Sequence, residues 1–252
     1  MRNMAQLLHY LPVLTFVLFP TTFLGTYIMA VLLEHVEPAF PYISDVATYS
    51  PESCIFGQFI NIGCVLLMLI VYVRYRHVLQ LMSLHQELII IRNINKNALW
   101  TGYAASLGLS LVANFQETNV KIAHFTGACF CFGLGTVYFW MQALVSYHLH
   151  PYTGSMILAH FRIVLSVICT IFFIIAFICG VLARLQYEGH NPRKWYPSDG
   201  GWIYHVCSTI SEWVVAVSFC FYILSFTREF RNLSINQPQL ELLENQLILN
   251  IS

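Results

Sequence analysis

Long apolar runs separated by short polar segments make up most of this chain of 252 residues. Six such runs lie at residues 11–33, 55–73, 98–115, 122–147, 163–183 and 202–226. Each is about as long as a helix that crosses ~30 Å of hydrocarbon, which takes roughly 20 residues. Apolar residues follow one another within each run instead of alternating with polar ones, which indicates helices rather than barrel strands. The pattern predicts an all-α polytopic membrane protein with a six-helix transmembrane bundle.

Lys and Arg residues near the ends of these runs predict the orientation, because cytosolic segments carry more of them. With the N-terminus in the cytosol, the cytosolic side holds Arg2, Arg74, Arg76, Arg92, Lys96, Arg162, Arg228 and Arg231. The other side holds Lys121, Arg184, Arg193 and Lys194. Eight residues against four favour both termini in the cytosol. We therefore expect a six-helix transmembrane domain at residues 1–230 and a cytosolic C-terminal tail at residues 231–252.

The composition agrees with a membrane protein. Hydrophobic residues form 58% of the chain and charged residues only 10%, whereas a soluble domain carries about a quarter charged residues. The formal net charge is zero, so no long-range field favours a nucleic-acid partner.

The segment between the first two runs, residues 34–53, has a pattern of its own. It carries four acids and no Lys or Arg, and the predicted orientation places it on the non-cytosolic side. Pro41 and Pro51 restrict the backbone at its two ends, which lowers the entropy lost when the segment docks. We expect a folded plug over the polar face of the bundle, anchored by Asp45 and Glu52. These acids can accept hydrogen bonds from His124, from His205 or from the free amides of a helix N-terminus.

Polar residues inside the predicted helices gather in the non-cytosolic half of the bundle. The main ones are Asn61, Asn114, His124, His205 and Glu212. Glu212 lies ten residues past Trp202, about 15 Å along a helix and therefore near the bilayer centre. An acid there costs on the order of 3 kcal/mol unless it is protonated or paired, so it marks a functional site by default. The structural alternative is a protonated Glu212 that holds helices together through Asn61 or Ser208.

The residue types in this region are compatible with catalysis or metal binding, but their pattern indicates neither. Asp45, Glu52, His124 and His205 include the side chains used for acid–base catalysis or metal binding. No HExxH or GxSxG motif supports either use, and we predict no catalytic residues, no metal site and no cofactor. A disulfide between Cys54 and Cys207 stays open, since both lie near non-cytosolic helix ends.

Several short motifs, in order along the chain, resemble one known family. They are PYISD at 41–45 with Ser44 and Asp45, PES at 51–53, IFG at 55–57, VANFQE at 112–117, His124 with Gly127, HFR at 160–162, YHV at 204–206, Glu212 with Trp213, and FTREF at 226–230. The set resembles the damage-regulated autophagy modulator (DRAM) family and spans nearly the whole chain. One departure is that Val46 and Ala47 stand where family members often have a glycine-containing turn.

The resemblance implies a six-helix protein of lysosomal and late-endosomal membranes that promotes autophagy. It implies a connection with the DNA damage response and apoptosis. The wider superfamily includes the TMEM150-like proteins and a remodelling factor for GPI lipids. Membrane lipids and other membrane proteins are the partners that it implies, while the oligomeric state stays open.

Three functions therefore compete. The first is a non-enzymatic regulator of autophagy that acts through membrane partners or lipids. The second is a lipid-modifying enzyme that uses Asp45, His124, His205 and Glu212 on the luminal side. The third, a transporter built around Glu212, has less support because the sequence shows neither an internal repeat nor paired broken helices.

Overall fold

The computed structural model describes residues 7–234, and this part of the chain contains helices and no strand. The helices are α1 (Tyr10–Leu32), α2 (Glu52–Leu84), α3 (Arg92–Asn114), α4 (Lys121–Ala128), α5 (Gly135–Leu149), α6 (Met156–Gln186), α7 (Trp202–Leu224) and α8 (Thr227–Phe230). A π-helical segment, η3 (Cys129–Leu134), joins α4 to α5 without a break, and short 3₁₀ turns are η1 (Asp45–Ala47), η2 (Gln86–Ile91) and η4 (Pro197–Asp199). The predicted all-α, six-helix architecture is confirmed. Most of the predicted tail, from residue 235 on, lies outside the described residues.

Five helices of the described chain are long and apolar enough to cross a membrane: α1, α2, the continuous α4–α5, α6, and α7 with α8. The remaining long helix, α3, begins with Arg92, Asn93 and Lys96, and these polar first turns lower its hydropathy. Helix α2 has 33 residues and is therefore about 50 Å long, well beyond the ~30 Å of hydrocarbon. It extends past residue 73, where the apolar run in the sequence ends.

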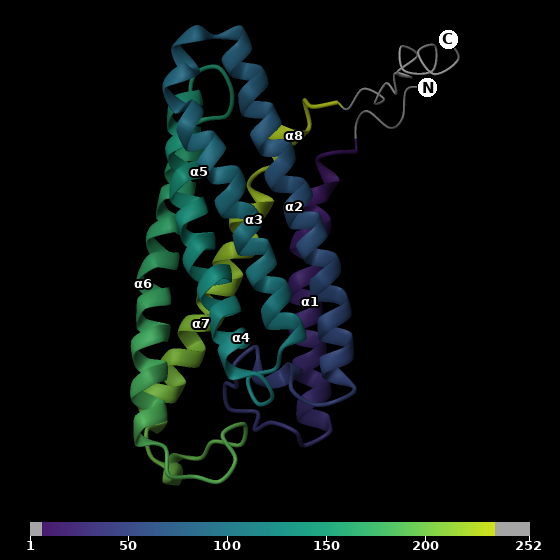
Figure 1. Cartoon of the computed structure of the whole chain (residues 1–252), viewed down its shortest axis with the longest axis vertical. Helices are drawn as coiled ribbons and strands as arrows, with labels where there is room; N and C mark the ends of the chain where they lie inside the picture. The colour runs from purple at the N-terminus through teal and green to yellow at the C-terminus, as the bar shows by residue number, and fades with distance from the viewer. Residues whose placement is uncertain (1–6, 235–252) are drawn as a thin grey trace, which may run out of the picture.

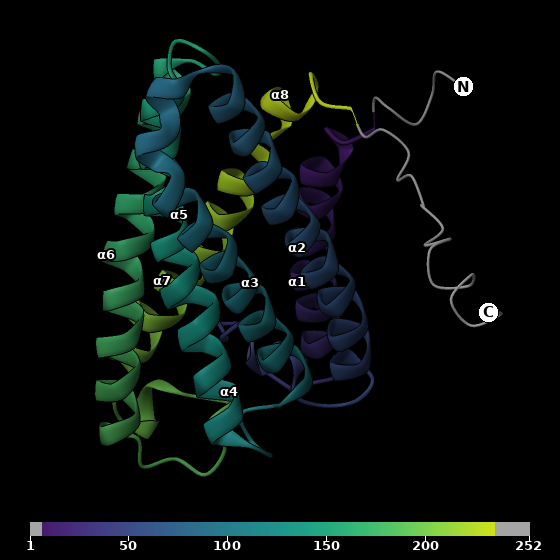
Figure 2. The ribbon, with the colours of Figure 1, turned by 45° about the horizontal axis from the view of Figure 1, so that its top comes forward.

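The six long helices form a closed ring (Figure 1). Helix α1 contacts α2, which contacts α3; the ring continues through α5, α6 and α7, and α7 returns to α1. We call the end where η1 and the starts of α2 and α7 lie the loop end, and the opposite end, where α1 begins and α7 stops, the terminal end (Figures 1 and 2). The described chain therefore enters and leaves the bundle at the same end.

Aromatic residues pack the ring tightly in its terminal half, and small residues do so near the loop end. The rings of Phe139 and Tyr222 stack with centroids 3.7 Å apart, and the Tyr222 hydroxyl donates to the Phe139 carbonyl oxygen at 2.7 Å. Near the loop end, α3 and α4 approach so closely at Gly108 and Gly127 that a Cβ on either residue would lie within 2.8 Å of its neighbours. Only glycine fits at such a helix crossing.

Candidate functional site

The first loop, residues 33–51, is folded into the loop end of the ring. Ile43, Val46 and Ala47 are buried, and Asp45 is only 9% exposed. Ile43 and Ala47 belong to the same apolar cluster as Phe56 of α2. A loop with buried apolar side chains is part of the core, which is the behaviour of a plug rather than of a simple connector.

Two neighbouring residues of α7 hold this loop by hydrogen bonds. The backbone N–H of Ile43 donates to Glu212 Oε2 at 3.0 Å, and Trp213 Nε1 donates to the Pro41 carbonyl oxygen at 3.0 Å. At the other end of the loop, Pro51 directly precedes α2. The loop is thereby fixed to the middle of the bundle.

The partners predicted for Glu212 are wrong. Asn61 of α2 instead exchanges hydrogen bonds with Asn114 of α3, at 3.0 and 3.1 Å, and Ser110 donates to Asn61 Oδ1 at 2.6 Å. Ser208 donates to the Ala176 carbonyl oxygen at 2.7 Å. Helix α2 lies next to α3 in the ring, so the two asparagines satisfy each other and leave Glu212 to the backbone of the loop.

The histidine partners predicted for the loop acids are also wrong. Glu52, the first residue of α2, pairs with His35 at 2.5 Å between Oε1 and Nδ1. His124 Nδ1 lies 2.7 Å from the carbonyl oxygen of Phe115. His205 stacks on the Trp195 ring, with centroids 4.3 Å apart. The observed partners are close in sequence: Phe115 lies nine residues from His124, and Trp195 lies in the segment that directly precedes the helix of His205.

The proposed luminal set of acids and histidines therefore does not form one hydrogen-bonded unit. Among residues 7–234, no group of three His, Cys, Asp or Glu side chains has the arrangement of a metal site. Cys54 and Cys207 are both free thiols in the structure, so the disulfide left open by the sequence is not formed.

Asp45 has an unusual electrostatic environment. Burial raises its pKa to about 7, and the nearby charge of Glu117 acts in the same direction. Arg193, from the segment between α6 and α7, opposes this shift. The side chain can therefore exchange a proton between neutral and mildly acidic pH.

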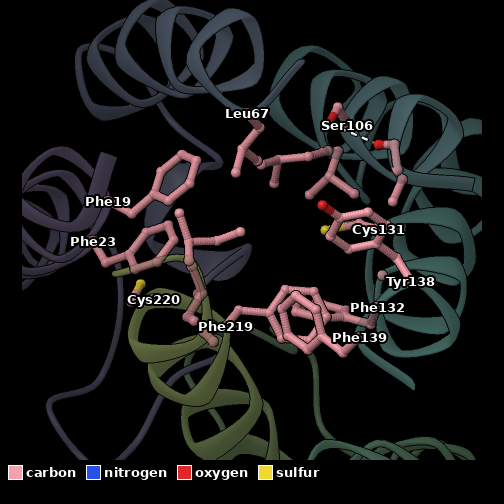
Figure 3. A pocket seen from close by; sticks show the side chains of 18 of the residues that line it. Phe19, Phe23, Leu67, Ser106, Cys131, Phe132, Tyr138, Phe139, Phe219 and Cys220 are labelled. Atoms are coloured by element: carbon pink, nitrogen blue, oxygen red, sulfur yellow. Dashed lines mark hydrogen bonds between the residues drawn. The ribbon is translucent and has the colours of Figure 1, made fainter. Parts of the chain in front are cut away.

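A central cavity lies between the helices (Figure 3), under the first loop. Ile43 and Ser44 of the loop line it, together with side chains from α1, α2, α3, η3, α5 and α7. The volume open to the centres of water-sized molecules is about 100 Å³, several times the ~10–15 Å³ that one water needs. Its walls are almost wholly apolar, and Glu212 lies at its loop-end wall. No pattern in the sequence predicts this cavity, because the residues that line it are spread along the chain from Phe19 to Ile223.

A buried cluster of charges closes the terminal end of the ring. Glu229 of α8 accepts from Arg162 of α6 at 2.6 Å and lies 3.2 Å from Arg74 of α2. Both arginines are fully buried, and both guanidinium groups lie over the ring of Phe226, at 5.4 Å for Arg74 and 4.4 Å for Arg162. Ser146 of α5 accepts hydrogen bonds from both.

This cluster was not predicted from the sequence, in which Arg74 and Arg162 count among the cytosolic charges that set the orientation. One signal was present: Arg162 and Glu229 both lie in the motifs HFR and FTREF. Their separation of 67 residues gives no indication of an ion pair.

Comparison with known proteins assigns the chain to a family. The family profile described as "Frag1/DRAM/Sfk1/Cwh43P N-terminal domain" matches residues 7–233. The chain belongs to this family. It is 35% identical over 233 residues to DNA damage-regulated autophagy modulator protein 2 of Homo sapiens, covering 91% of this chain and 86% of that protein.

Two further relatives extend the comparison. DNA damage-regulated autophagy modulator protein 1 of Xenopus laevis is 35% identical over 90% of this chain and 92% of its own length. The modulator of macroautophagy TMEM150B of Danio rerio is 31% identical over 79% of this chain and 74% of its own length. No solved structure matches the chain.

Proposed function

We propose that this protein promotes autophagy from the membranes of lysosomes and late endosomes, and that it does so without catalysing a reaction. The observation that carries the proposal is the similarity, over nine-tenths of the chain, to proteins named as autophagy modulators. The names of the relatives also connect the proposed role with the response to DNA damage. A role in apoptosis belongs to the same proposal.

The proposed mode of action is binding of membrane lipids or of other membrane proteins. The central cavity supports binding of lipids, because it is lined by apolar side chains and lies inside the helix bundle, with about 100 Å³ open to the centres of water-sized molecules. The outer faces of the helices support contact with lipids or membrane partners. Ile171, Ile174 and Phe177 of α6, for example, are all about half exposed.

The enzyme alternative has less support in the geometry. Its proposed acid and base groups have separate partners: Glu212 accepts from a loop amide, His124 contacts a carbonyl oxygen, and His205 stacks on Trp195. A general base needs hydrogen-bond reach to the proton that it removes, and the described side chains supply no acid–histidine pair in the cavity wall.

The test uses cells that lack the protein. Autophagic flux is measured as the accumulation of a lipid-conjugated autophagosome marker when lysosomal degradation is blocked, and localisation is measured in isolated lysosomes. Loss of the protein should lower autophagic flux. Re-expression of the wild-type chain should restore the flux, and the re-expressed protein should be found in the lysosomal fraction. Unchanged flux, or a rescuing protein that is absent from lysosomes and late endosomes, contradicts the proposal.

The enzyme alternative is tested in the same cells by lipidomics. Rescue with His205→Ala or Asp45→Asn should restore flux to the extent that the variant folds and reaches its membrane. A lipid substrate that accumulates with a folded, correctly delivered variant would place the enzyme first.

A further inference from the structure

The central cavity has the length of one lipid chain in one leaflet. It extends along α7 from Glu212 to Ile223, which is eleven residues and about 16 Å of helix. Half of the ~30 Å hydrocarbon core is about 15 Å. A volume of about 100 Å³ along this length leaves room for one narrow hydrocarbon body and not for two side by side.

Apolar side chains line this space over most of its length. Phe19 and Phe23 of α1 face Phe219 of α7 and Phe139 of α5 across it (Figure 3). Ser106 also lines the cavity, but its hydroxyl is already bonded to the Gly102 carbonyl oxygen at 2.9 Å. Such walls favour a hydrocarbon occupant over water.

Polar groups remain for an occupant toward both ends of the cavity, and at the loop end they include the Ser44 hydroxyl. The same end holds the carboxyl group of Glu212, whose Oε2 accepts from Ile43. Within residues 7–234 no group donates to its Oε1, and the exposed surface of this half-buried residue opens into the cavity that it lines. Oε1 is therefore available to a hydrogen-bond donor.

The group toward the other end is the hydroxyl of Tyr138 of α5. Tyr138 is only 3% exposed, and its hydroxyl oxygen has no hydrogen-bond partner in the described chain. Figure 3 shows the ring directed into the cavity. Buried hydroxyls nearly always have a partner. The Tyr138 oxygen is almost fully covered by neighbouring atoms, so an occupant of the cavity supplies that partner by displacing neighbouring side chains.

Glu212 and Tyr138 lie at different depths. The Tyr222–Phe139 hydrogen bond places Tyr138 near the level of Tyr222, and Glu212 precedes Tyr222 by ten residues. The separation along the bundle axis is therefore on the order of 10–15 Å. We propose that the cavity binds an elongated lipid with a polar group at each end of a narrow hydrocarbon body: a donor (hydroxyl or amine) at Glu212 and an oxygen at Tyr138. The inference deepens the lipid route of the proposed function, and it rests on that function only for its role in the cell.

The occupant can come from two sources that share this chemistry, a single-chain lipid oxidised at its far end or a sterol hydroxylated on its side chain. The experiment uses the full chain in phosphatidylcholine nanodiscs. One probe is a photoreactive amino-dodecanol with its two polar groups at opposite ends, and the second is a matched dodecylamine. Labelled peptides are identified and quantified by mass spectrometry.

The amino-dodecanol should label peptides that line the cavity. Glu212→Gln should lower labelling by both probes, about tenfold or more for the charged hydrogen bond to the amine. Tyr138→Phe should lower labelling by amino-dodecanol several-fold and leave labelling by dodecylamine unchanged. A merely structural role of Tyr138 would change labelling by both probes equally, and that result would overturn its assignment.

The cavity itself is tested by filling it. Ala216→Phe should abolish labelling by both probes, whereas Val217→Phe, on the exposed outer face of the same helix, should leave it unchanged. Ala105→Leu, from the α3 wall, serves if Ala216→Phe does not fold. Labelling that survives the folded cavity-filling variant would overturn the proposal.

Competition identifies the source of the occupant. Displacement by a side-chain-hydroxylated sterol assigns the sterol, and displacement by an end-hydroxylated chain assigns the single-chain lipid; either outcome supports the proposal. Equal displacement by cholesterol, or by a simple alkane without polar groups, overturns the requirement for two polar ends. Autophagic flux that depends on the protein without such binding would sink this inference and leave the proposed function standing.

Discussion

The backbone N–H of Ile43 donates a hydrogen bond to Glu212 Oε2 at 3.0 Å, across 169 positions of sequence. This bond connects the first loop with a carboxyl group in the middle of a membrane helix. Trp213 adds a second bond to the loop, at the Pro41 carbonyl oxygen. The loop-end wall of the cavity and the loop next to it are thus one structural unit, and the first predictions concern this unit.

Replacing Glu212 should show what the carboxyl group contributes. In Glu212→Gln the amide oxygen still accepts from Ile43, so the folded fraction should stay close to that of the wild type. Glu212→Leu leaves the Ile43 N–H without a partner, at a cost of roughly 1–3 kcal/mol. Thermal unfolding of the purified chain measures the difference. Equal loss of function in both variants, with normal stability and delivery, would instead show that an ionisable group is required.

Asp45 should make the docked loop more stable in acid. Its pKa in the folded chain, about 7, lies above the ordinary value of 3.8, so between these pH values the folded state holds a proton that the unfolded state has lost. The stabilisation is complete below about 3.8 and is lost as the pH rises through about 7. The unfolding temperature at pH 5 should exceed that at pH 7.5 by more in the wild type than in Asp45→Asn.

The matched control is Glu188→Gln, an exposed acid of the segment between α6 and α7. It should keep the pH dependence of the wild type. An Asp45→Asn protein with the same pH dependence as the wild type would show that Asp45 does not titrate in this range.

The charge cluster at the terminal end predicts an order of damage. Glu229→Ala removes the acid between two buried guanidinium groups and should destabilise the bundle by roughly 3–5 kcal/mol. Arg74→Ala leaves the Arg162–Glu229 pair intact and should cost less. Arg76→Ala, two residues away and exposed, should have little effect. Thermal unfolding in detergent gives the order, and an Arg76→Ala protein as unstable as Glu229→Ala would contradict it.

The orientation of the bundle also stays a prediction. A small tag inserted after Thr48 should be protected when only the plasma membrane is permeabilised, because the first loop is expected in the lumen. A tag inserted after Gln239 in the C-terminal tail should be accessible to antibody from the cytosol. The opposite pattern would reverse the orientation and place Asp45 in the cytosol, where the acidic lumen cannot reach it.

The helices were predictable because continuous apolar runs are a sufficient signal for membrane helices. The run at 202–226 and the observed α7 at Trp202–Leu224, for example, agree within two residues at each end. The polar first turns of a helix are harder to predict from hydropathy. Helix α3, for example, begins at Arg92, although its apolar run begins at residue 98. Helical periodicity continues through those polar turns without raising hydropathy.

The site was only partly predictable. Glu212 was identifiable because an acid at that depth is costly, but its partner is a backbone amide, and every residue has one except proline. The side chains that line the cavity, such as Phe19 and Tyr138, are ordinary apolar and aromatic residues of ordinary helices. What distinguishes them is a space between helices, which depends on packing and not on the identity of any one residue.

Glu229 is also among the last residues of the bundle to be synthesised. A ribosome makes the chain from its N-terminus, so Arg74 and Arg162 exist before the acid that joins them. Until α8 has been made, the guanidinium groups of Arg74 and Arg162 lack the carboxylate of Glu229. A chain that ended before Glu229 would keep the six long helices of the bundle and still bury two guanidinium groups without the acid that pairs with them, so the single turn of α8 neutralises charges that belong to helices made much earlier.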